Sequence, residues 1–487
     1  MSVSAATISA LIDRTPTGLL INGEWTTTGA SFAVENPATQ EPLTEIADAG
    51  VPEAVAALDA AVAAQEAWAA TDPRHRGEIL RKAFELITAR ADDFALLMTL
   101  EMGKPLAEAR GEVTYGAEFL RWFSEEAVRI SGRYSIAPSG GTRLLTMKQP
   151  IGPVYAITPW NFPLAMGTRK LGPALAAGCT VVIKPAALTP LTTLAFARVL
   201  IEAGVPDGVV NVITTTKSGE VSKRIISDPR LRKLTFTGST GVGQQLIAQS
   251  AEQVLKISME LGGNAPFLVF GDADLDRAVD GAMLAKMRNI GEACTAANRF
   301  IVHESVAAEF SRRFADRMGA LTVGPGYEDG VQVGPLIERK AVDKVEELVG
   351  NAVGAGATVL TGGHQLDRRG YFYAPTVLTD VPPTADVFHQ EIFGPVAPIT
   401  TFDSDDEGLR LANDTEYGLV AYAFTTDLSR ALKVAEGLQT GMVGINQGVV
   451  SNPAAPFGGV KQSGLGREGG SEGIDEYLET KYVGIAL

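Results

Sequence analysis

The chain has 487 residues, too many for one hydrophobic core, and its 45% hydrophobic and 20% charged residues are typical of a globular protein rather than a disordered one. Its formal net charge of −15 repels phosphate backbones, so nucleic-acid binding is not predicted as the main role. Two cysteines and 4 histidines predict neither a disulfide-stapled secreted protein nor a metal site, and the lack of a leader or of a roughly 20-residue apolar stretch predicts a cytoplasmic protein with no membrane association.

The first part of the chain has helical periodicity and is followed by an extended arm. Apolar residues recur at three- and four-residue spacing over 52–70, 76–99 and 112–130, which predicts amphipathic helices. Residues 132–149 alternate between apolar and polar side chains, which predicts an extended arm. The tail, residues 474–487, alternates in the same way and is predicted to be a strand that pairs with this arm or with another subunit.

From residue 151 the pattern becomes strand, turn and helix in repetition. Such alternation is typical of a mostly parallel sheet covered by helices on both faces. The predicted strands are 154–158, 179–184, 209–212, 234–237 and 254–260, and the helices between them are 164–177, 190–203 and 241–251. After Gly263 the alternation starts again with 267–270, 275–287, 300–303 and 306–319, and continues through 399–402, 409–413, 419–425, 428–438 and 442–446. Two successive α/β units predict two domains, with ligands near their junction.

Cys294 follows a predicted helix in the segment MRNIGEACTAANR. A free cysteine is most often a small buried hydrophobe. Here the neighbours include Asn289 and Thr295, and a polar setting after a helix favours an exposed thiolate nucleophile. Cys179, at the start of an apolar strand, is interpreted as a core residue.

Four other segments contain candidate site residues. Glu260 ends a strand before two glycines in MELGGNAP, which makes it a general-base candidate, with a solvated loop residue as the alternative. Asn161 lies in the proline-rich turn TPWNFP and is suited to donate to an oxyanion, unless that turn is only structural. The segment FTGSTGVG presents backbone N–H groups to a phosphate, and Lys184 at the end of VVIK is suited to a ribose hydroxyl or a 2′-phosphate.

Together these segments resemble the aldehyde dehydrogenase superfamily over nearly the whole chain. The motifs that carry the resemblance are TPWNFP, VVIKPA, FTGST, MELGGNAP, the Cys294 segment, EIFGPV and PFGGVKQSGLGRE. The resemblance implies the aldehyde dehydrogenase fold, an α/β fold with a Rossmann-like cofactor domain, an α/β catalytic domain and a small β oligomerisation arm. The expected boundaries are 1–131 and 151–260 for the dinucleotide-binding domain, 261–446 for the catalytic domain, 132–150 and 470–487 for the arm, and 447–469 for a Gly-rich active-site loop.

The resemblance implies catalytic roles for five residues. Cys294 is similar to the nucleophile that attacks the aldehyde to form a thiohemiacetal, and Asn161 with the Cys294 backbone N–H is similar to the oxyanion hole. Hydride transfer to a nicotinamide then leaves a thioester, and Glu260 is similar to the base that activates water to hydrolyse it. Lys170 and Glu468 are similar to a pair that relays the proton.

The positions that match cofactor-contacting residues are Trp160, Lys184, Ala187, Gly238, Ser239, Leu261, Glu391 and Phe393. Glu391 matches the carboxylate that holds the nicotinamide ribose. Many NAD-preferring members carry a glutamate where Ala187 stands, and its charge repels a 2′-phosphate, so the cofactor implied is NADP, with NAD as the alternative.

Two further departures from the family pattern lie beside the nucleophile. Glu292 replaces the usual glutamine and is predicted to raise the pKa of the Cys294 thiol if it lies close to it. Ala296 stands where some relatives carry a second cysteine, so no redox disulfide is predicted.

Within the superfamily the chain most resembles the succinate-semialdehyde dehydrogenases. In that group the residues that match Arg169, Arg288 and Ser451 bind the distal carboxylate of the substrate. Two arginines aimed into a cleft select a carboxylated semialdehyde over a neutral aldehyde, whereas the alternative is that both form ordinary salt bridges.

The resemblance therefore implies oxidation of succinate semialdehyde to succinate with NAD(P)+ in a homodimer or homotetramer built through the arm. Glutarate semialdehyde, one methylene longer, and a broader range of aldehydes are the near alternatives. The others are a catalytically silent cofactor-binding relative and a coenzyme-A-acylating relative. Intact Cys294, Glu260 and Asn161 count against the first, and Glu260 counts against the second.

Overall fold

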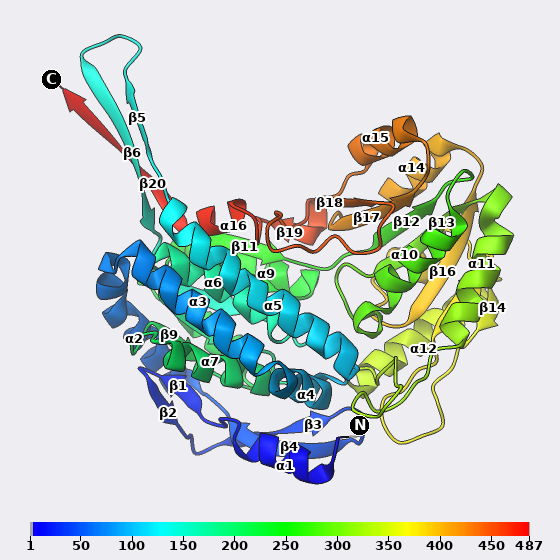
Figure 1. The fold of residues 1–487 in the computed structure, drawn as a ribbon, viewed down its shortest axis with the longest axis horizontal. Coiled ribbons are helices and arrows are strands. Elements are labelled where there is room, and N and C mark those ends of the chain that lie inside the picture. Colours follow the sequence, from blue (N-terminus) through cyan, green and yellow to red (C-terminus); the bar gives the residue numbers. More distant parts are fainter. Residues whose placement is uncertain (1–2, 487) are drawn as a thin grey trace.

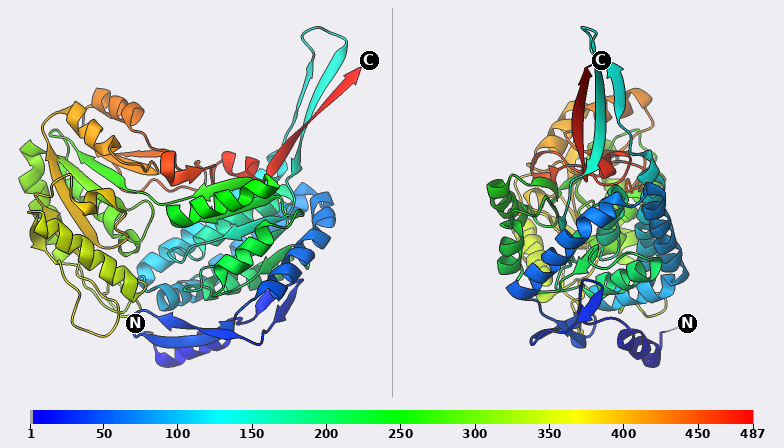
Figure 2. Two further views of the ribbon diagram at one scale, coloured as in Figure 1. Left: turned by 180° about the vertical axis from the view of Figure 1, so that it is seen from behind. Right: turned by 90° about the vertical axis from the view of Figure 1, so that its left-hand side faces the viewer.

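The computed structural model describes residues 3–486 and arranges them as two α/β lobes with a narrow projecting arm (Figure 1). Residues 1, 2 and 487, which the predicted domain boundaries include, lie outside the described residues. Two further views show that the arm stands clear of both lobes (Figure 2). None of the described helices is both long and apolar enough to cross a membrane.

The first lobe is built on an eight-stranded sheet. Its parallel centre has the spatial order β11 (Lys256–Glu260), β10 (Lys233–Thr237), β7 (Val154–Ile157), β8 (Val181–Lys184) and β9 (Val210–Val212). Antiparallel strands extend both edges, namely β1 (Leu19–Ile21) and β2 (Glu24–Thr26) beyond β9, and β19 (Gly464–Leu465) beside β11. The strand order reverses around β7, and ligands of open parallel sheets bind at the carboxyl ends of strands at such a point.

The second lobe is built on a seven-stranded sheet, again mostly parallel. Its spatial order is β14 (Thr358–Thr361), β15 (Thr376–Thr379), β16 (Val396–Phe402), β13 (Ala297–His303), β12 (Ala265–Val269), β17 (Val420–Phe424) and β18 (Met442–Ile445), with the β14–β15 pair antiparallel. The predicted boundary at residue 260 falls between β11 of the first sheet and β12 of the second.

Both sheets are buried on both faces, which explains their continuous Val- and Ile-rich strands. In β7, Val154 packs in one hydrophobic cluster and Tyr155 in another on the opposite face, because successive residues of a strand point to opposite sides. In β12, Phe267 and Leu268 divide in the same way between two clusters of the second lobe.

Helices cover these faces, as the strand–helix alternation predicts. The first lobe has α1 (Ala5–Asp13), α2 (Val51–Ala70), α3 (Pro73–Ala89), α4 (Ala91–Met102), α5 (Leu106–Glu126), α6 (Ala165–Ala177), α7 (Leu191–Ala203), α8 (Ser218–Ile226) and α9 (Thr240–Ser250). The second has α10 (Leu275–Met287), α11 (Glu304–Gly319), α12 (Arg339–Gly354), α13 (Asp386–His389), α14 (Asp405–Asn413) and α15 (Leu428–Gly437), and α16 (Glu472–Asp475) follows near the end of the chain. Short 3₁₀ turns are η1 (Ala127–Arg129), η2 (Ala251–Gln253), η3 (Arg288–Gly291) and η4 (Lys461–Ser463), and a separate hairpin joins β3 (Ser31–Asn36) to β4 (Glu41–Ala47).

The single helix predicted over residues 76–99 is wrong, because the structure has two helices there. Helix α3 ends and α4 begins around Arg90, whose φ of −112° and ψ of 25° leave the helical region. Asp92 and Asp93 then lie in the first turn of α4, where carboxylates interact favourably with the helix dipole. The apolar spacing continues across the break, so periodicity alone joins the two helices.

The arm is a three-stranded antiparallel sheet of β5 (Arg133–Ile136), β6 (Thr142–Pro150) and β20 (Leu478–Ala486). Strand β20 pairs with β6 along its whole length, from Leu478 opposite Pro150 to Ala486 opposite Thr142. The predicted pairing of the tail with the arm is therefore confirmed, although the first residues of the predicted tail strand form α16 instead.

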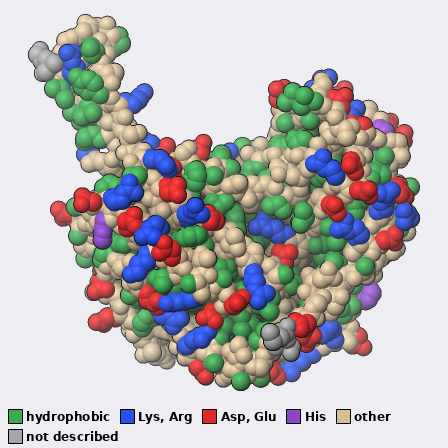
Figure 3. Space-filling view, in the orientation of Figure 1, with side chains coloured by type: hydrophobic (Ala, Val, Ile, Leu, Met, Phe, Trp, Pro, Cys, Tyr) green, Lys and Arg blue, Asp and Glu red, His purple; other side chains and the backbone are tan. Residues whose placement is uncertain are grey.

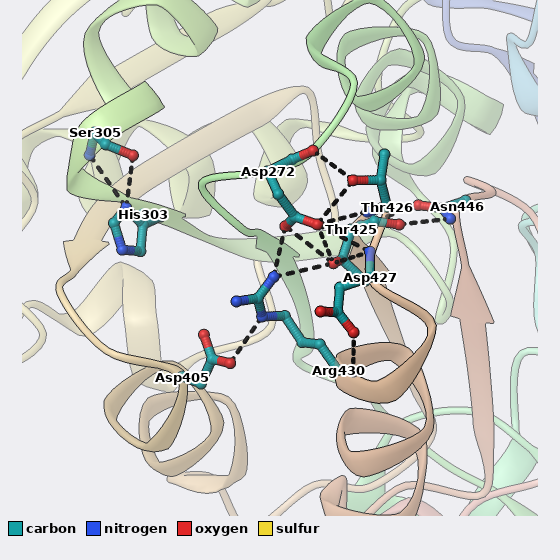
Figure 4. Close-up of polar contacts among 9 residues, drawn as sticks. All are labelled: Asp272, His303, Ser305, Asp405, Thr425, Thr426, Asp427, Arg430 and Asn446. Atoms are coloured by element: carbon teal, nitrogen blue, oxygen red, sulfur yellow. Dashed lines mark hydrogen bonds and ion pairs between the residues drawn. The ribbon is translucent and has the colours of Figure 1, made fainter.

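A cluster of hydrogen bonds around the Asp272 carboxylate connects the loop after β12 to the start of α15 (Figure 4). The Asp272 carboxylate accepts hydrogen bonds from the Thr425 hydroxyl (2.8 Å) and from the backbone N–H groups of Thr426 and Asp427 (2.9 Å each), and it pairs with Arg430 at 2.8 Å. Partial burial raises the pKa of Asp272, but these donors outweigh it and hold the pKa at about 2.

We expect Asp272→Ala to lower the free energy of unfolding by about 2 kcal/mol at neutral pH, because charged hydrogen bonds are lost and their donors are left without an acceptor. Since the folded-state pKa is depressed, this contribution is complete above about pH 4 and is lost as the pH falls towards the folded value. Denaturant unfolding of both proteins along a pH series measures it. Asp405→Ala, which removes an exposed partner of Arg430, is the control and is expected to cost less than about 1 kcal/mol. A difference that does not change with pH would contradict the assignment.

Candidate active site

A cavity of about 320 Å³ opens at the carboxyl ends of the first lobe's parallel strands and faces the second lobe. The predicted site residues that line it are Trp160, Asn161, Gly238, Ser239, Leu261, Cys294, Glu391 and Phe393. They come from loops after β7, β10 and β11, from the loop before β13, and from the EIFGPV segment. The cavity also has a wall that the sequence did not predict, made by Ile337, Glu338, Lys340, Ala341 and Lys344 at the start of α12.

Cys294 lies in the loop between η3 and β13, and its side chain is half-buried. Burial raises the pKa of its thiol to about 12, with Arg169 and Arg288 lowering it and Glu391 and Glu260 raising it. The structure thus differs from the expected exposed thiolate, because desolvation favours the neutral thiol. A base has to take this proton before the sulfur becomes a nucleophile.

An unusual turn precedes Cys294. Asn289, Ile290 and Gly291 have consecutive φ values of 57°, 64° and 79°, a left-handed conformation that is strained for a β-branched residue such as Ile290. The Asn289 side-chain amide donates to the backbone oxygens of Asn161 (3.1 Å) and Glu292 (2.8 Å). The turn therefore fastens the Cys294 loop to the TPWNFP turn.

The Asn161 side chain is held beside this loop. It is buried, and its Nδ2 donates to the Glu292 backbone oxygen at 3.0 Å. Asn161 and Cys294 both line the cavity, so the amide and the thiol face the same space. This arrangement suits an amide that stabilises negative charge developing next to the sulfur.

A buried ion pair holds the TPWNFP turn from behind, and the sequence analysis missed it. Lys104, just after α4, pairs with Glu112 of α5 and donates to the Asn161 backbone oxygen at 2.7 Å. Glu112 accepts from the backbone N–H groups of Leu164 (2.9 Å) and Ala165 (3.1 Å), at the first turn of α6. The ion pair therefore holds the chain by hydrogen bonds within the turn and just after it. Its only signal in the sequence is the charged Glu112 on the apolar side of the predicted helix.

Glu260 lies at the end of β11 and is buried. Its Oε2 has no hydrogen-bond partner among residues 3–486. Burial, followed by the charge of Glu468, raises the pKa of Glu260 well above its ordinary value, with Arg169 and Lys170 acting in the opposite direction. A carboxylate of raised pKa with a free oxygen is a good proton acceptor near neutral pH.

Lys170 and Glu468 are brought together, at 2.6 Å between the ammonium and the carboxylate. Arg169 binds the other oxygen of Glu468 at 2.6 Å and stacks 3.8 Å from the centre of the Phe457 ring. Burial raises the pKa of Glu468, but Lys170 and Arg169 outweigh it and hold the pKa below its ordinary value. Arg169 thus forms a buried salt bridge, in agreement with the alternative to substrate binding given in the sequence analysis.

Arg288 and Ser451 also meet, although they are far apart in the chain. The Arg288 Nη1 lies 3.5 Å from the Ser451 hydroxyl, and the guanidinium carbon lies 5.1 Å from the centre of the Phe162 ring. Its charge is close enough to lower the pKa of the Cys294 thiol. The arrangement places a cation and a hydroxyl on one side of the nucleophile.

The EIFGPV segment contributes Glu391, Ile392 and Phe393 to the lining of the cavity. The Glu391 side chain accepts from the Gly263 N–H at 3.0 Å, and burial raises its pKa to about 7. Lys344 donates to the Glu391 backbone oxygen at 2.6 Å. The rings of Trp160 and Phe393 meet edge to face, with centroids 5.3 Å apart.

Lys184 ends β8 away from the thiol, and Ala187 lies in the loop that follows. The buried Lys184 ammonium contacts the Pro185 backbone oxygen (3.3 Å) and the Ser218 hydroxyl (3.4 Å), and burial lowers its pKa to about 8. Uncharged partners leave this cation uncompensated, so the site suits an anion. Lys184 and Ala187 are not among the residues that line the cavity, whereas Gly238 and Ser239, which lead into α9, do line it and have the backbone geometry of a phosphate site. These residues fit a dinucleotide with an additional phosphate.

Glu292 is hydrogen-bonded to the segment that precedes α12 and is not among the charges that raise the pKa of the Cys294 thiol. Its Oε1 accepts from the Ile337 N–H at 3.1 Å, and burial raises its pKa well above the ordinary value. The charges that raise the pKa of Cys294 come instead from Glu391 and Glu260. Cys179 is buried, as predicted, and both cysteines are free. No group of three or more His, Cys, Asp or Glu side chains within residues 3–486 is arranged to hold a metal ion.

Comparison with known proteins gives an independent result. The pattern of the aldehyde dehydrogenase family matches residues 25–483. A succinate-semialdehyde dehydrogenase from Paenarthrobacter nicotinovorans is 62% identical over 91% of this chain and 99% of its own, and a glutarate-semialdehyde dehydrogenase from Pseudomonas putida is 50% identical over 96% and 97%. The crystal structure of an E. coli NADP-dependent enzyme superposes with a TM-score of 0.96 at 50% identity, covering 98% of this chain and 99% of that one.

Proposed function

The chain belongs to the aldehyde dehydrogenase family and has its fold, and we propose that it oxidises succinate semialdehyde to succinate with NADP+, accepting NAD+ as the second choice. The observation that carries this proposal is the contact between Arg288 and Ser451, with the Arg288 charge close enough to Cys294 to lower the pKa of its thiol. A guanidinium and a hydroxyl there suit an aldehyde whose far end is a carboxylate. The high identity to a succinate-semialdehyde dehydrogenase supports the same substrate.

The proposed reaction begins with the Cys294 thiol. Once a water molecule has accepted the thiol proton, the sulfur attacks the aldehyde carbon, the carbon–oxygen π bond breaks, and the carbonyl oxygen becomes an oxyanion. Asn161 Nδ2 and the Cys294 backbone N–H donate to this oxygen. A bound nicotinamide dinucleotide supplies the hydride acceptor that turns the thiohemiacetal into a thioester.

Hydrolysis completes the turnover. Glu260 takes a proton from water, the water oxygen bonds to the acyl carbon, and the carbon–sulfur bond breaks to release the acid and the thiolate. Glu468, paired with Lys170, relays this proton onward, because its carboxylate is close enough to Glu260 to raise the pKa of Glu260 and its own lowered pKa lets it release the proton again readily. We assign the distal carboxylate of the substrate to Arg288 and Ser451, while Arg169, already paired with Glu468, adds positive charge from behind.

We propose that the cofactor contacts Trp160, Lys184, Ala187, Gly238, Ser239, Leu261, Glu391 and Phe393. The domain division stated in the sequence analysis and the active-site role of residues 447–469 belong to the same proposal. We further propose a cytoplasmic homodimer or homotetramer assembled through the arm. Figure 3 shows hydrophobic side chains gathered on that arm, and Tyr134, Ile136 and Tyr482 are 66%, 58% and 60% exposed there.

Steady-state kinetics with succinate semialdehyde, glutarate semialdehyde and butanal test the substrate. We expect kcat/KM to be highest for succinate semialdehyde, lower by about 10-fold for the longer semialdehyde and lowest for neutral butanal. Arg288→Ala is expected to lower kcat/KM roughly 100-fold for both semialdehydes and to leave butanal nearly unchanged. Arg277→Ala, an exposed arginine of α10, is the control. A wild-type enzyme that prefers butanal would overturn the proposal.

The cofactor has its own test at Ala187. Ala187→Glu introduces a carboxylate in the loop after Lys184, where it repels a 2′-phosphate and neutralises the ammonium. We expect kcat/KM with NADP+ to fall at least about 10-fold while kcat/KM with NAD+ changes little. Ala187→Gln, similar in size and uncharged, separates charge from steric effects. Equal losses with both cofactors in both variants would argue against a phosphate contact near this position.

A further inference from the structure

Tyr115 of α5 lies on the wall that surrounds the nucleophile. It packs against the cluster that contains Phe162, Ala293 and Ala296. Phe162 follows Asn161, and the two alanines flank the Cys294–Thr295 dipeptide in the chain. The sequence analysis assigned no role to this tyrosine.

Tyr115 also stands between the two arginines of the site. The guanidinium carbon of Arg288 lies 5.4 Å from the centre of its ring. On the other side, the ring meets Phe119 edge to face at 5.0 Å, and the guanidinium carbon of Arg169 lies 5.8 Å from the Phe119 ring. Burial lowers the pKa of Arg169, and the charge of Glu468, followed by Tyr115, raises it. Tyr115 therefore lies close to Arg169 as well.

The Tyr115 hydroxyl is a buried polar atom that has no hydrogen-bond partner among residues 3–486. Two other buried tyrosines have hydrogen-bond partners, Tyr155 on Ser222 (3.0 Å) and Tyr422 on the Thr295 backbone oxygen (2.9 Å). The hydroxyl of Tyr373 in the second lobe is unpaired within the described chain as well, but its ring touches neither arginine of the site. Buried hydroxyls are normally paired, and a guanidinium is a donor that cannot accept the hydroxyl proton. The missing partner is therefore an acceptor, and an anionic oxygen attracted by the arginines supplies one.

We infer that Tyr115 is a specificity-determining residue, whose hydroxyl donates a hydrogen bond to the distal carboxylate of the semialdehyde held by Arg288 and Ser451. The inference rests on the proposed function and adds a neutral donor to a site otherwise defined by charge. Because α5 fixes the position of this hydroxyl, the hydrogen bond forms best with a carboxylate at one distance from Cys294. It therefore contributes to the discrimination between four- and five-carbon semialdehydes.

Tyr115→Phe removes the hydroxyl and keeps the ring under Arg288. We expect kcat/KM for succinate semialdehyde to fall about 10- to 100-fold, chiefly through KM, and kcat/KM for butanal to stay within about twofold. Inhibition by succinate, which carries the same carboxylate but no aldehyde, is expected to weaken at least about 10-fold. Tyr155→Phe, which removes a buried hydroxyl from the first sheet, is the matched control and leaves both substrates unaffected.

The outcomes separate this inference from the proposed function. If the wild-type enzyme does not favour succinate semialdehyde over butanal, the proposed function fails, whatever Tyr115 does. If the wild-type enzyme shows that preference and Tyr115→Phe retains it together with succinate inhibition, the role of Tyr115 is overturned. An equal loss for butanal and the semialdehyde would also overturn it, because the hydroxyl would then be supporting the fold of the site.

Discussion

Cys294→Ala is expected to abolish aldehyde oxidation, lowering kcat/KM by a factor of about 10⁴ or more, because Cys294 is the only thiol among the described residues that line the cavity. NADPH formation measures the loss. The variant is expected to bind NADPH still, since the residues proposed to contact the cofactor are unchanged. Quenching of Trp160 fluorescence on addition of NADPH measures this binding. Cys179→Ala, at a buried cysteine in the first lobe, is the control and is expected to retain activity.

The raised pKa of the half-buried Cys294 thiol predicts that its reactivity depends on pH. Because burial raises its pKa to about 12, the free enzyme holds the neutral thiol at neutral pH. We expect alkylation of Cys294 by iodoacetamide to be slow there and to accelerate about tenfold for each pH unit towards the pKa, since only the thiolate reacts. Fast alkylation that does not change between neutral and mildly alkaline pH would contradict a protonated resting thiol.

Glu260→Gln is expected to stop turnover after the first chemical step. The thioester still forms, so stopped-flow mixing is expected to show a burst of about one NADPH for each active site. Steady-state kcat then falls by about 10²- to 10⁴-fold, because no carboxylate activates the water. Glu252→Gln, at an exposed glutamate that precedes β11, is the control.

A small nucleophile distinguishes this mechanism from simple damage to the site. Hydroxylamine attacks a thioester without a general base, so it is expected to restore steady-state NADPH formation in Glu260→Gln. A variant without a burst, and without rescue by hydroxylamine, would show that Glu260 acts before the thioester forms.

The sequence predicted those parts of the fold and site that depend on local patterns. The parallel strands β7 to β11 are short apolar runs, and each predicted cofactor or catalytic residue next to them lies at or just after a strand end. The sequence alone therefore predicts that one edge of a sheet carries Asn161, Lys184, Gly238 and Glu260. The polar neighbours of Cys294 in the chain already indicated a nucleophile, and the family motifs added Glu391 and the pair of Lys170 with Glu468.

What the sequence did not predict depends on long-range contacts. The wall of the cavity formed by α12 carries no motif, and the ion pair of Lys104 with Glu112 is decided by the packing of α4, α5 and α6. The protonated state of Cys294 follows from desolvation, which the polar residues around it in the chain do not reveal. The family resemblance predicts that Arg169 contacts the substrate. The ion pair that Arg169 forms instead could not be read from the sequence, because its partner Glu468 lies about three hundred residues away in the chain.

The edge pairing of β11 has a consequence for how the enzyme is made in the cell. Glu260 lies opposite Gly464 of β19, and the Lys170 ammonium reaches Glu468, so the proposed base and its proposed proton relay are completed by a segment that follows β11 by about 200 residues. While the protein is being translated, both lobes can begin to fold with that segment still inside the ribosome. A nascent chain thus carries the thiol before its proposed hydrolytic residues are in place, and the complete site forms only after residues 464–468 have been synthesised and have folded.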